Sequence, residues 1–377
     1  MTQTVTRIPL PAASPGTQRT LTVHRFGAPG ARPRAYLHAA LHADELPPLL
    51  VLHHLLRRLA AAEEAIRGEI VVVPVANPIG LDQQLNGRLL GRFAFDASGN
   101  FNRGFPDLAA AVAETVRPRL GNDTAANVAA IREALTAAAA DLPRSGELEA
   151  LRAILLGLSI DADLVLDLHC DSEALLHLYA SRQHRDIALV LGRELAVAAV
   201  LLEDEPGGDP FDEANAAPWW RLRQRLNIDL PLACFATTVE FRGQAEVDDR
   251  LAERDAAALF RFLQRRGVIA GDPGPPPGGE PRVSPLEGVD VLTAPAAGLL
   301  AYRKGLGEVV QAGETVAELV DLTAEDPAAA RTPIVSRTDG LVLARMAEKL
   351  VSPGRKFCKI AGGQSLAHRR AGKLLED

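Results

Sequence analysis

The chain has 377 residues, of which 47% are hydrophobic and 24% charged, as expected for a globular protein with a sizeable core. Its formal net charge of −7 argues against a nucleic-acid binder, because such proteins usually carry a basic surface. Three widely spaced cysteines do not make a disulfide framework. The N-terminus lacks the apolar core of a signal peptide, and no apolar run is long enough for a membrane helix, so we expect a cytoplasmic protein.

The first third of the chain alternates between strand-like and helix-like segments. Residues 21–26 alternate in polarity and predict an edge strand, and residues 34–41 predict a second strand that leads into His42. Residues 69–76 are a nearly continuous apolar run, typical of a strand buried on both faces. A helix is predicted over residues 49–62, directly after a Pro-Pro pair that suits a first helical turn. Strand, helix and strand in this order predict an α/β fold with a mixed, mostly parallel sheet flanked by helices.

The middle of the chain begins with an irregular stretch, residues 79–107, which is rich in Gly, Asn, Asp and Arg. A loop of this length inside a compact domain is usually functional or disordered. Residues 107–160 are rich in Ala and Leu and predict three helices, with breaks near residues 121–124 and 143–146. Further along, the pattern predicts strands at residues 163–168, 175–180 and 232–241, helices at residues 184–200, 219–226 and 246–266, and an acidic loop at residues 203–218.

A Pro- and Gly-rich linker predicts a domain boundary at residues 269–282, between a catalytic domain of residues 1–268 and an all-β domain of residues 283–377. The second domain contains a pseudo-repeat, in which AGLL is followed by VVQAG and, later, DGLV by LVSPG. This pattern resembles the barrel-sandwich of biotinyl and lipoyl carrier domains. The hairpin at residues 321–331 lacks the lysine that a carrier needs, so we expect a structural role or a homo-oligomer contact.

Two strand ends carry residues that bind metals. His42 follows the strand predicted at residues 34–41, with Glu45 just before the helix, and His169 follows the strand at residues 163–168. The carboxyl ends of parallel strands meet at one edge of a sheet, where these side chains could form a His-Glu-His zinc site. Two unrelated histidines are the alternative. Asp167, two residues before His169, could support that ligand or have a structural role.

A hydrolytic zinc site also needs a base and groups that bind the substrate. Glu240 near the end of an apolar strand is our candidate for the base, because a buried glutamate needs a task or a partner, and a salt bridge to Arg242 is the alternative. Asn102 and Arg103 could grip a substrate carboxylate. Arg92 could stabilise the oxyanion, although an isolated loop arginine is more often a solvated charge.

Four short motifs carry a family resemblance: HADE at 42–45, NRGFP at 102–106, DLHCD at 167–171 and VEFRG at 239–243. In this order they resemble the succinylglutamate desuccinylase/aspartoacylase family of the zinc carboxypeptidase-like superfamily. The resemblance implies one zinc held by His42, Glu45 and His169, with Glu240 as catalytic base. It also implies that Asn102 and Arg103 hold a substrate carboxylate and that Arg92 is the polarising arginine, with Arg88 nearby. Ala43 stands where the family usually has glycine.

The resulting expectation is a zinc-dependent amidohydrolase that removes the acyl group from an N-acyl amino acid, with Glu240 as general base for a metal-activated water. A zinc carboxypeptidase acting on short peptides is the alternative, because the same residues would cleave either amide bond. A non-catalytic binding protein on this fold is a third hypothesis, which predicts the loss of a ligand or of the base. The remaining histidines are assigned to packing or surface roles, and they include His38, His53, His54, His177 and His184.

Overall fold

The computed structural model describes residues 3–96, 99–204 and 207–370, and the chain falls into two units. The first unit contains Met1–His169, Gly208–Val239 and Val247–Pro276, and the second contains Cys170–Gly207, Glu240–Glu246 and Pro277–Asp377. Residues 270–281 form neither helix nor strand. The domain boundary at residues 269–282 stays a prediction.

The first unit is built on strands in the order β1-β2-β4-β3-β7-β11. Strand β3 pairs in parallel with β4 and β7, while β1 and β2 add an antiparallel edge. Strands β3 and β4 are buried at every position, which the apolar sequence of β4 predicted. The strands are β1 (Thr4–Pro9), β2 (Thr20–Phe26), β3 (Arg34–Ala39), β4 (Glu69–Val73), β7 (Leu164–Asp171) and β11 (Phe235–Gly243), and the last residues of β7 and β11 belong to the second unit.

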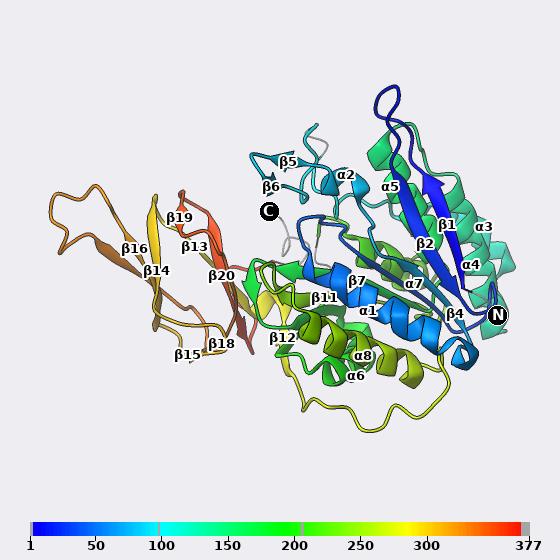
Figure 1. Cartoon of the computed structure of the whole chain (residues 1–377). Coiled ribbons are helices and arrows are strands. Elements are labelled where there is room, and N and C mark those ends of the chain that lie inside the picture. Colours follow the sequence, from blue (N-terminus) through cyan, green and yellow to red (C-terminus); the bar gives the residue numbers. More distant parts are fainter. Residues whose placement is uncertain (1–2, 97–98, 205–206, 371–377) are drawn as a thin grey trace. The chain divides into compact units, whose positions relative to one another are not determined.

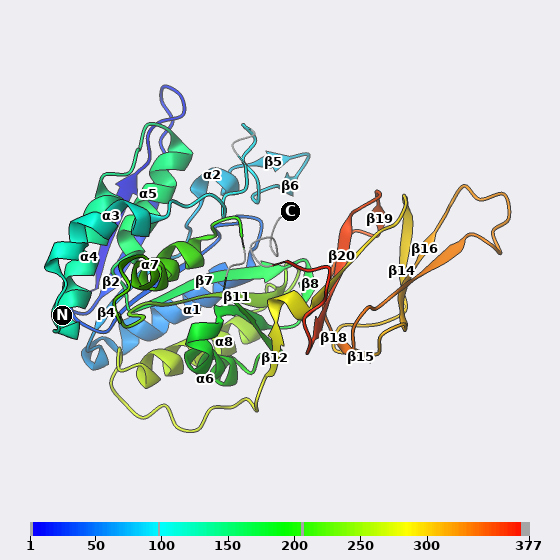
Figure 2. The ribbon, with the colours of Figure 1, turned by 180° about the vertical axis from the view of Figure 1, so that it is seen from behind.

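Helices cover both faces of this sheet (Figures 1 and 2). One layer shares the main core with Val71 and Val73 of β4, and it consists of α3 (Leu108–Val116), α4 (Thr124–Ala140), α5 (Glu147–Ser159) and α7 (Phe211–Leu226). On the other face, α1 (Pro47–Ala61) and α8 (Asp249–Arg265) run side by side. The short elements of the unit are α2 (Pro78–Leu81), the hairpin β5 (Gln84–Leu85) and β6 (Arg88–Leu89), and the 3-10 turns Glu63–Ala65 and Arg117–Arg119.

The second unit joins a small parallel sheet to two antiparallel sheets. Strand β10 (Ala199–Glu203) pairs in parallel with β9 (His177–Ser181) and β12 (Arg282–Pro285), and α6 (Arg185–Leu195) connects β9 to β10. One antiparallel sheet runs β13 (Val289–Thr293), β20 (Lys356–Gly362), β18 (Gly340–Arg345), β15 (Val309–Val310), with β8 (Glu173–Ala174) also on β18. The other runs β17 (Arg331–Val335), β16 (Thr315–Val320), β14 (Gly298–Tyr302), β19 (Leu350–Val351). Two 3-10 turns, Arg182–His184 and Leu286–Gly288, complete the unit.

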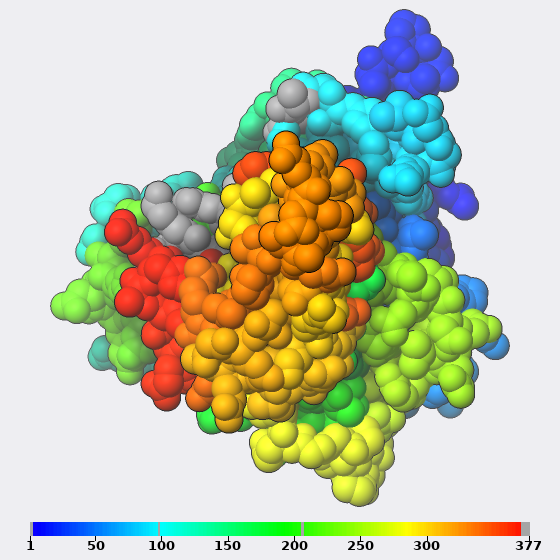
Figure 3. Space-filling model, turned by 90° about the vertical axis from the view of Figure 1, so that its left-hand side faces the viewer, coloured from blue at the N-terminus to red at the C-terminus, as the bar shows by residue number. Residues whose placement is uncertain are grey.

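The pseudo-repeat of the sequence reappears in the strand pairing. The long strand of the first repeat, β14, pairs with the short strand of the second, β19, and β18 pairs with β15 in the same swapped manner. The two sheets enclose one apolar core, which includes Leu300, Val316, Val342 and Phe357. Figure 3 shows one surface of these sheets, coloured from yellow to red.

The predicted fold class is confirmed, with a mixed, mostly parallel sheet, flanking helices and antiparallel C-terminal sheets. The three helices expected in residues 107–160 are α3, α4 and α5. Among the residues that the structure describes, no helix is long and apolar enough to cross a membrane.

Three local predictions were wrong, each for a physical reason. The strand at residues 21–26 is not at the edge, because β1 pairs with β2 on its outer side. The helix predicted over residues 184–200 ends at Leu195, where Ala196 takes a left-handed φ of 54° and the apolar run that follows forms β10. The predicted loop at residues 203–218 contains the first half of α7, which continues through Pro218.

Candidate metal centre

The corner between β3 and α1 places His42 and Glu45 at the carboxyl edge of the first unit's sheet. After β3 ends at Ala39, Ala40 adopts a φ of 58°, a left-handed conformation that non-glycine residues rarely take outside special sites. The side-chain amide of Asn77 donates to the Leu41 carbonyl over 2.9 Å. The backbone that carries His42 is therefore fixed from both sides.

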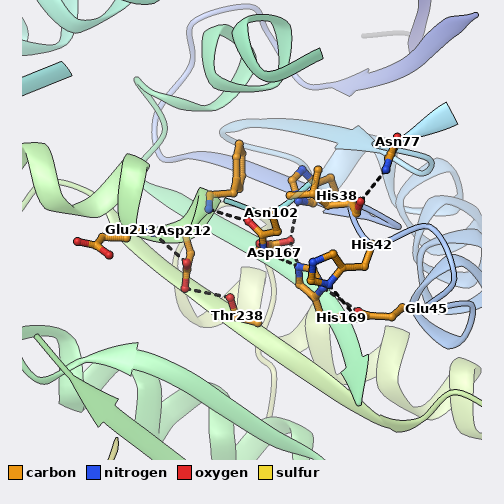
Figure 4. Close-up of polar contacts among 12 residues, drawn as sticks. His38, His42, Glu45, Asn77, Asn102, Asp167, His169, Asp212, Glu213 and Thr238 are labelled. Atoms are coloured by element: carbon orange, nitrogen blue, oxygen red, sulfur yellow. Dashed lines mark hydrogen bonds and ion pairs between the residues drawn. The ribbon is translucent and has the colours of Figure 1, made fainter. Parts of the chain in front are cut away.

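His42, Glu45 and His169 come together as expected, with one ligand atom from each lying within 4.8 Å of the others. The Nδ1 atom of His42 is 2.9 Å from Glu45 Oε1, and Nδ1 of His169 is 2.7 Å from Glu45 Oε2. All three side chains are buried, and Figure 4 shows them turned toward one another. Both imidazoles therefore direct the same kind of nitrogen at a single carboxylate.

The outer nitrogens of both histidines have partners of their own. Nε2 of His42 is 2.8 Å from Asn100 Oδ1, and Nε2 of His169 is 2.8 Å from Asp167 Oδ1. Acceptors at Nε2 hold a proton on that atom and leave Nδ1 available as a ligand, the arrangement common around protein-bound metals. Asp167 thus contacts and orients His169, which was one of the two roles that the sequence suggested for it.

A buried chain of polar contacts continues behind Asp167. His38 Nε2 lies 2.6 Å from Asp167 Oδ1, and His38 Nδ1 lies 3.0 Å from the Tyr36 hydroxyl. The sequence analysis assigned His38 to packing, and the structure does bury it completely. The sequence held one signal of the contact between His38 and Tyr36: the two residues are two positions apart on β3, and alternate residues of a strand share a face.

The charges around Glu45 favour a cation at the point where the three side chains meet. Burial by itself would lower the pKa of His169, but the carboxylates of Asp167 and Glu45 raise it well above its usual value. The pKa of Glu45 is lowered despite its burial, because both histidines stabilise the carboxylate. Burial and the charge of Arg92 lower the pKa of His42, so this ring is neutral at pH 7, as a metal ligand must be.

Arg92 lies beside this cluster, at a position made possible by the glycine before it. Its Nη1 atom is 3.2 Å from Glu45 Oε1, while 41% of the side chain is exposed. A Cβ on Gly91 would lie 2.6 Å from the Asp44 nitrogen and 2.7 Å from Ala43 Cβ, so only glycine allows this close approach. The loop is also bonded to the corner through the Ala43 N–H and the Gly91 carbonyl at 3.0 Å.

Asn102 and Arg103 follow in the loop that enters α3. The Asn102 amide donates to Asp167 Oδ2 over 3.1 Å, and its oxygen accepts the Phe211 N–H over 2.8 Å, so it links Asp167 to the start of α7. Arg103 Nη1 donates to the Asn102 carbonyl over 2.7 Å. Gly208, with a φ of +82°, leaves room for the Arg103 side chain, because a Cβ there would lie 2.8 Å from Arg103 Cδ. Carboxylate binding by this pair stays a prediction.

Glu240 belongs to the second unit. It lies on β11, where half-buried Thr238, Glu240 and Arg242 alternate with buried Val239 and Phe241. Its role as a general base stays a prediction.

Asp212 is a site residue that the sequence analysis missed. It occupies the second position of α7, is half-buried, and accepts a hydrogen bond from the Thr238 hydroxyl over 2.9 Å. Burial, reinforced by the charge of Asp167, raises the pKa of its carboxyl group to about 6. Residues 203–218 had been read as a loop, so nothing in the pattern placed this side chain near Asp167 (Figure 4).

The donor set of two imidazoles and one carboxylate suits a divalent metal such as zinc, with a coordination position left open for another ligand. Such a position is typical of catalytic sites rather than structural ones. The charge balance at Glu45 and the support of both outer nitrogens fit the same interpretation.

Comparison with known proteins places the chain among proteins of one family. The chain is similar to a protein assigned to the succinylglutamate desuccinylase/aspartoacylase family from Shewanella amazonensis SB2B, with a TM-score of 0.82, 26% identity and coverage of 96% of this chain and 98% of that one. A related structure from Shewanella frigidimarina NCIMB 400 gives a TM-score of 0.83 at 24% identity, covering 96% and 97%.

A more distant structural neighbour is the product-bound ectoine utilization protein EutE (DoeB) from Ruegeria pomeroyi, with a TM-score of 0.66, 18% identity and coverage of 96% and 95%. This likeness shows the fold. A search of curated proteins gave no match. Residues 31–266 match the succinylglutamate desuccinylase/aspartoacylase catalytic domain, and the chain therefore belongs to this family of hydrolases.

Proposed function

We propose that this protein is a zinc-dependent amidohydrolase that removes the acyl group from a small N-acyl amino acid. The observation that carries the proposal is the convergence of His42 Nδ1 and His169 Nδ1 on the two oxygens of Glu45. Their outer nitrogens rest on Asn100 and Asp167, so the rings are already oriented for a metal.

Zinc held by these three residues would supply a Lewis acid for the amide carbonyl and would make water more acidic. The chain adds fixed positive charge next to that point. Arg92, 3.2 Å from Glu45 and partly exposed, is suited to stabilise the negative charge that develops on the carbonyl oxygen. It is both anchored in the site and open to an incoming substrate.

Two further roles complete the proposed mechanism. Asn102 and Arg103 bind a carboxylate of the substrate, for which the planar guanidinium of Arg103 offers two parallel donors. Glu240 takes a proton from the attacking water and returns it to the amine that leaves, which balances the hydrolysis of the amide. The products are a carboxylic acid and a free amino acid.

The test is metal content and hydrolysis measured on the same preparations. We expect about one zinc per chain and release of acid from N-acyl amino acids. Glu240→Gln should retain the zinc while kcat falls by about 100-fold or more. Glu114→Gln, an exposed position on α3, is the matched control and should behave as the wild type. Full activity of Glu240→Gln would remove this residue from the mechanism.

The same assay separates the two substrate classes. N-acetyl and N-succinyl amino acids should be cleaved faster than unblocked dipeptides of similar size. A preference for dipeptides would show a peptidase instead. Wild-type protein that binds no zinc and cleaves neither class would overturn the proposed function.

A further inference from the structure

Lys359, a residue of the C-terminal sheets, lies among the side chains that follow the metal-binding strand. It is on β20, and its Nζ atom is 2.5 Å from Asp171 Oδ2 and 3.3 Å from the Tyr179 hydroxyl. Asp171 is the last residue of β7 and Tyr179 is on β9. The ammonium group of Lys359 is thus held by the last residue of β7 and by a residue of β9, and all three residues belong to the second unit.

The segment after β7 is held by the C-terminal sheets at several other points. Ser172 Oγ accepts the Ala347 N–H over 2.9 Å, and Glu173 forms an ion pair with Arg345 at 3.0 Å. The β8 strand pairs with β18, and Leu175 N–H donates to the Leu343 carbonyl over 3.0 Å. Lys359 is therefore one contact in a continuous attachment, which keeps its ammonium group in one place.

The same segment is bonded to the end of β11, the strand of Glu240. The Gln244 N–H donates to the carbonyls of Asp171 and Ser172 at 3.0 and 3.1 Å. A Cβ on Gly243 would lie 3.0 Å from the Ser172 oxygen, so the two backbones approach closely. Glu240 precedes this junction by three residues, on a strand whose exit is fixed against Asp171.

The charges around Lys359 identify what its ammonium group does. Burial alone would lower its pKa, but Asp171, Tyr179 and Glu240 together raise it, so Lys359 is a cation. Burial and the nearby charge of Lys359 lower the pKa of His177 to about 4, so this ring is neutral at pH 7. The titratable groups around the ammonium and Glu240 are Asp171 on β7, His177 and Tyr179 on β9, Arg242 on β11, and Arg369, which interacts with Tyr179.

An electrostatic interaction between two groups acts equally on both. Because the Glu240 carboxylate favours charged Lys359, charged Lys359 favours the Glu240 carboxylate over its neutral acid. A general base must be ionised before it can accept a proton, so a fixed cation close by serves that role. Asp171 and Tyr179 hold the ammonium group in place.

We propose that Lys359 is a positioning residue for the reaction, through which the C-terminal sheets keep Glu240 in place and ionised. This inference rests on the proposed function, in which Glu240 is the base. It gives the C-terminal sheets a role in the chemistry, beyond the structural or oligomerising role that their sequence predicted.

The experiment compares Lys359→Met and Lys359→Arg with wild type in the full-length zinc-loaded protein. Lys356→Met is the matched control, because Lys356 lies three residues earlier on β20 and is exposed. In Lys359→Met we expect kcat to fall by up to about tenfold at pH values below the acid limb of its profile, with KM and zinc content unchanged. The acid limb of the kcat profile should move up by about one pH unit. Lys359→Arg should keep the wild-type limb because it keeps the charge.

A second readout does not depend on catalysis. The side-chain carboxyl carbons of ¹³C-labelled glutamates are titrated by NMR, and the Glu240 signal is assigned by its disappearance in Glu240→Gln. The titration midpoint of Glu240 should be higher in Lys359→Met than in wild type, by the same amount as the acid limb of the kcat profile moves. An unchanged midpoint in well-folded Lys359→Met, or an equal shift in Lys359→Arg, would overturn the inference.

These outcomes separate the inference from the proposed function. Active wild type with an unshifted Lys359→Met profile would contradict only the role of Lys359. Inactive wild type would contradict the proposed function, and the NMR midpoint would still decide whether Lys359 controls the ionisation of Glu240. If Lys359→Met does not fold, Lys359→Gln and the arginine variant supply the comparison.

Discussion

The two ends of the parallel strands β3, β4 and β7 both carry buried charged side chains, but the charges are arranged differently. At the amino ends, Arg34 opens β3 and Glu69 opens β4, with Arg34 Nε 3.0 Å from Glu69 Oε2. Asp163, directly before β7, accepts the Arg34 N–H over 2.6 Å and pairs with Arg132 at 2.5 Å. Each carboxylate there meets at least one guanidinium group.

At the carboxyl ends, the side chains converge on one point instead. Two imidazoles approach Glu45, and Asp167 stands behind one of them. Arg92 is the arginine that contacts Glu45, and it is partly exposed. A bound metal ion would compensate the carboxylate charge at this end, whereas the chain's own arginines compensate it at the amino end.

The difference teaches how one sheet separates stability from function. Breaking a buried ion pair leaves an uncompensated charge and costs several kcal/mol of stability. A cluster that a bound cation completes contributes less to the fold when the cation is absent, so its residues can be changed at lower cost to the fold and higher cost to metal binding. Substitutions at the amino ends should therefore mainly lower stability, whereas substitutions at the carboxyl ends should mainly weaken metal binding.

The largest effect is expected at the carboxyl end. Glu45→Gln removes a charged ligand, and we expect zinc affinity to fall by more than about 100-fold, beyond the loss typical for a supporting residue. Glu69→Gln is the matched control at the amino end, where Arg25 and Arg34 would each lose one ion pair, although Arg34 keeps its pair with Asp161. It should bind zinc normally but unfold at lower urea concentration. Zinc titration and urea unfolding of both variants provide the test, and equal zinc affinities would contradict the contrast.

The second effect concerns stability and its dependence on pH. The pKa of Asp163 is lowered: burial would raise it, but the Arg34 N–H, Arg132 and Arg32 stabilise the carboxylate more strongly. A carboxyl group with a depressed pKa in the folded state contributes stability above its unfolded pKa, near 4, and loses it as pH falls further.

Asp163→Asn should therefore lower the free energy of unfolding by about 2 kcal/mol at pH 7, and the deficit should shrink below about pH 4. Asp229→Asn is the control, because its pair with Arg223 is exposed and should contribute less than about 1 kcal/mol. Urea unfolding at pH 7, 5 and 3 measures both. A deficit that persists unchanged at pH 3 would show that the asparagine disturbs packing rather than charge.

Much of this fold follows from local sequence signals. Apolar runs identified β4 and β7 as core strands, and the segment that leads into His42 predicted β3. Gaps in the Ala- and Leu-rich stretch separated α3, α4 and α5. The failures occurred where the three-dimensional context decides. Strand β1 exists because β2 offers it an edge, and α7 runs through Pro218 because the helix packs into the main core.

The site divides in the same way. His42, Glu45 and His169 were found because strand ends of a parallel sheet meet at one edge, a rule that sequence alone can apply. Asn100 and Asp212 were assigned no role and His38 was assigned to packing, since their contacts join segments far apart in the chain. No local sequence pattern indicates which amide or carboxylate is the hydrogen-bond partner of a given histidine.

The smallest effect is expected at Asp212, near the carboxyl end. Its pKa of about 6 lies above the unfolded value, so the folded state binds its proton more tightly. Stability from this group is present below about pH 4 and is lost as pH rises toward 6. In metal-free protein, Asp212→Asn should therefore be more stable than wild type at pH 8, by about 1 kcal/mol after allowing for its partial exposure.

Asp186→Asn is the matched control, because Asp186 occupies the same second position of a helix, α6, but is fully exposed. That variant should lose about 0.5 kcal/mol of stability at pH 8, since an ionised aspartate at a helix start is favourable. The two variants therefore change stability in opposite directions at one helix position. Thermal unfolding in the presence of a chelator, at pH 4 and 8, measures the difference. Destabilisation of Asp212→Asn at pH 8 would mean that the ionised carboxylate is favourable at this end, as it is among the arginines at the other.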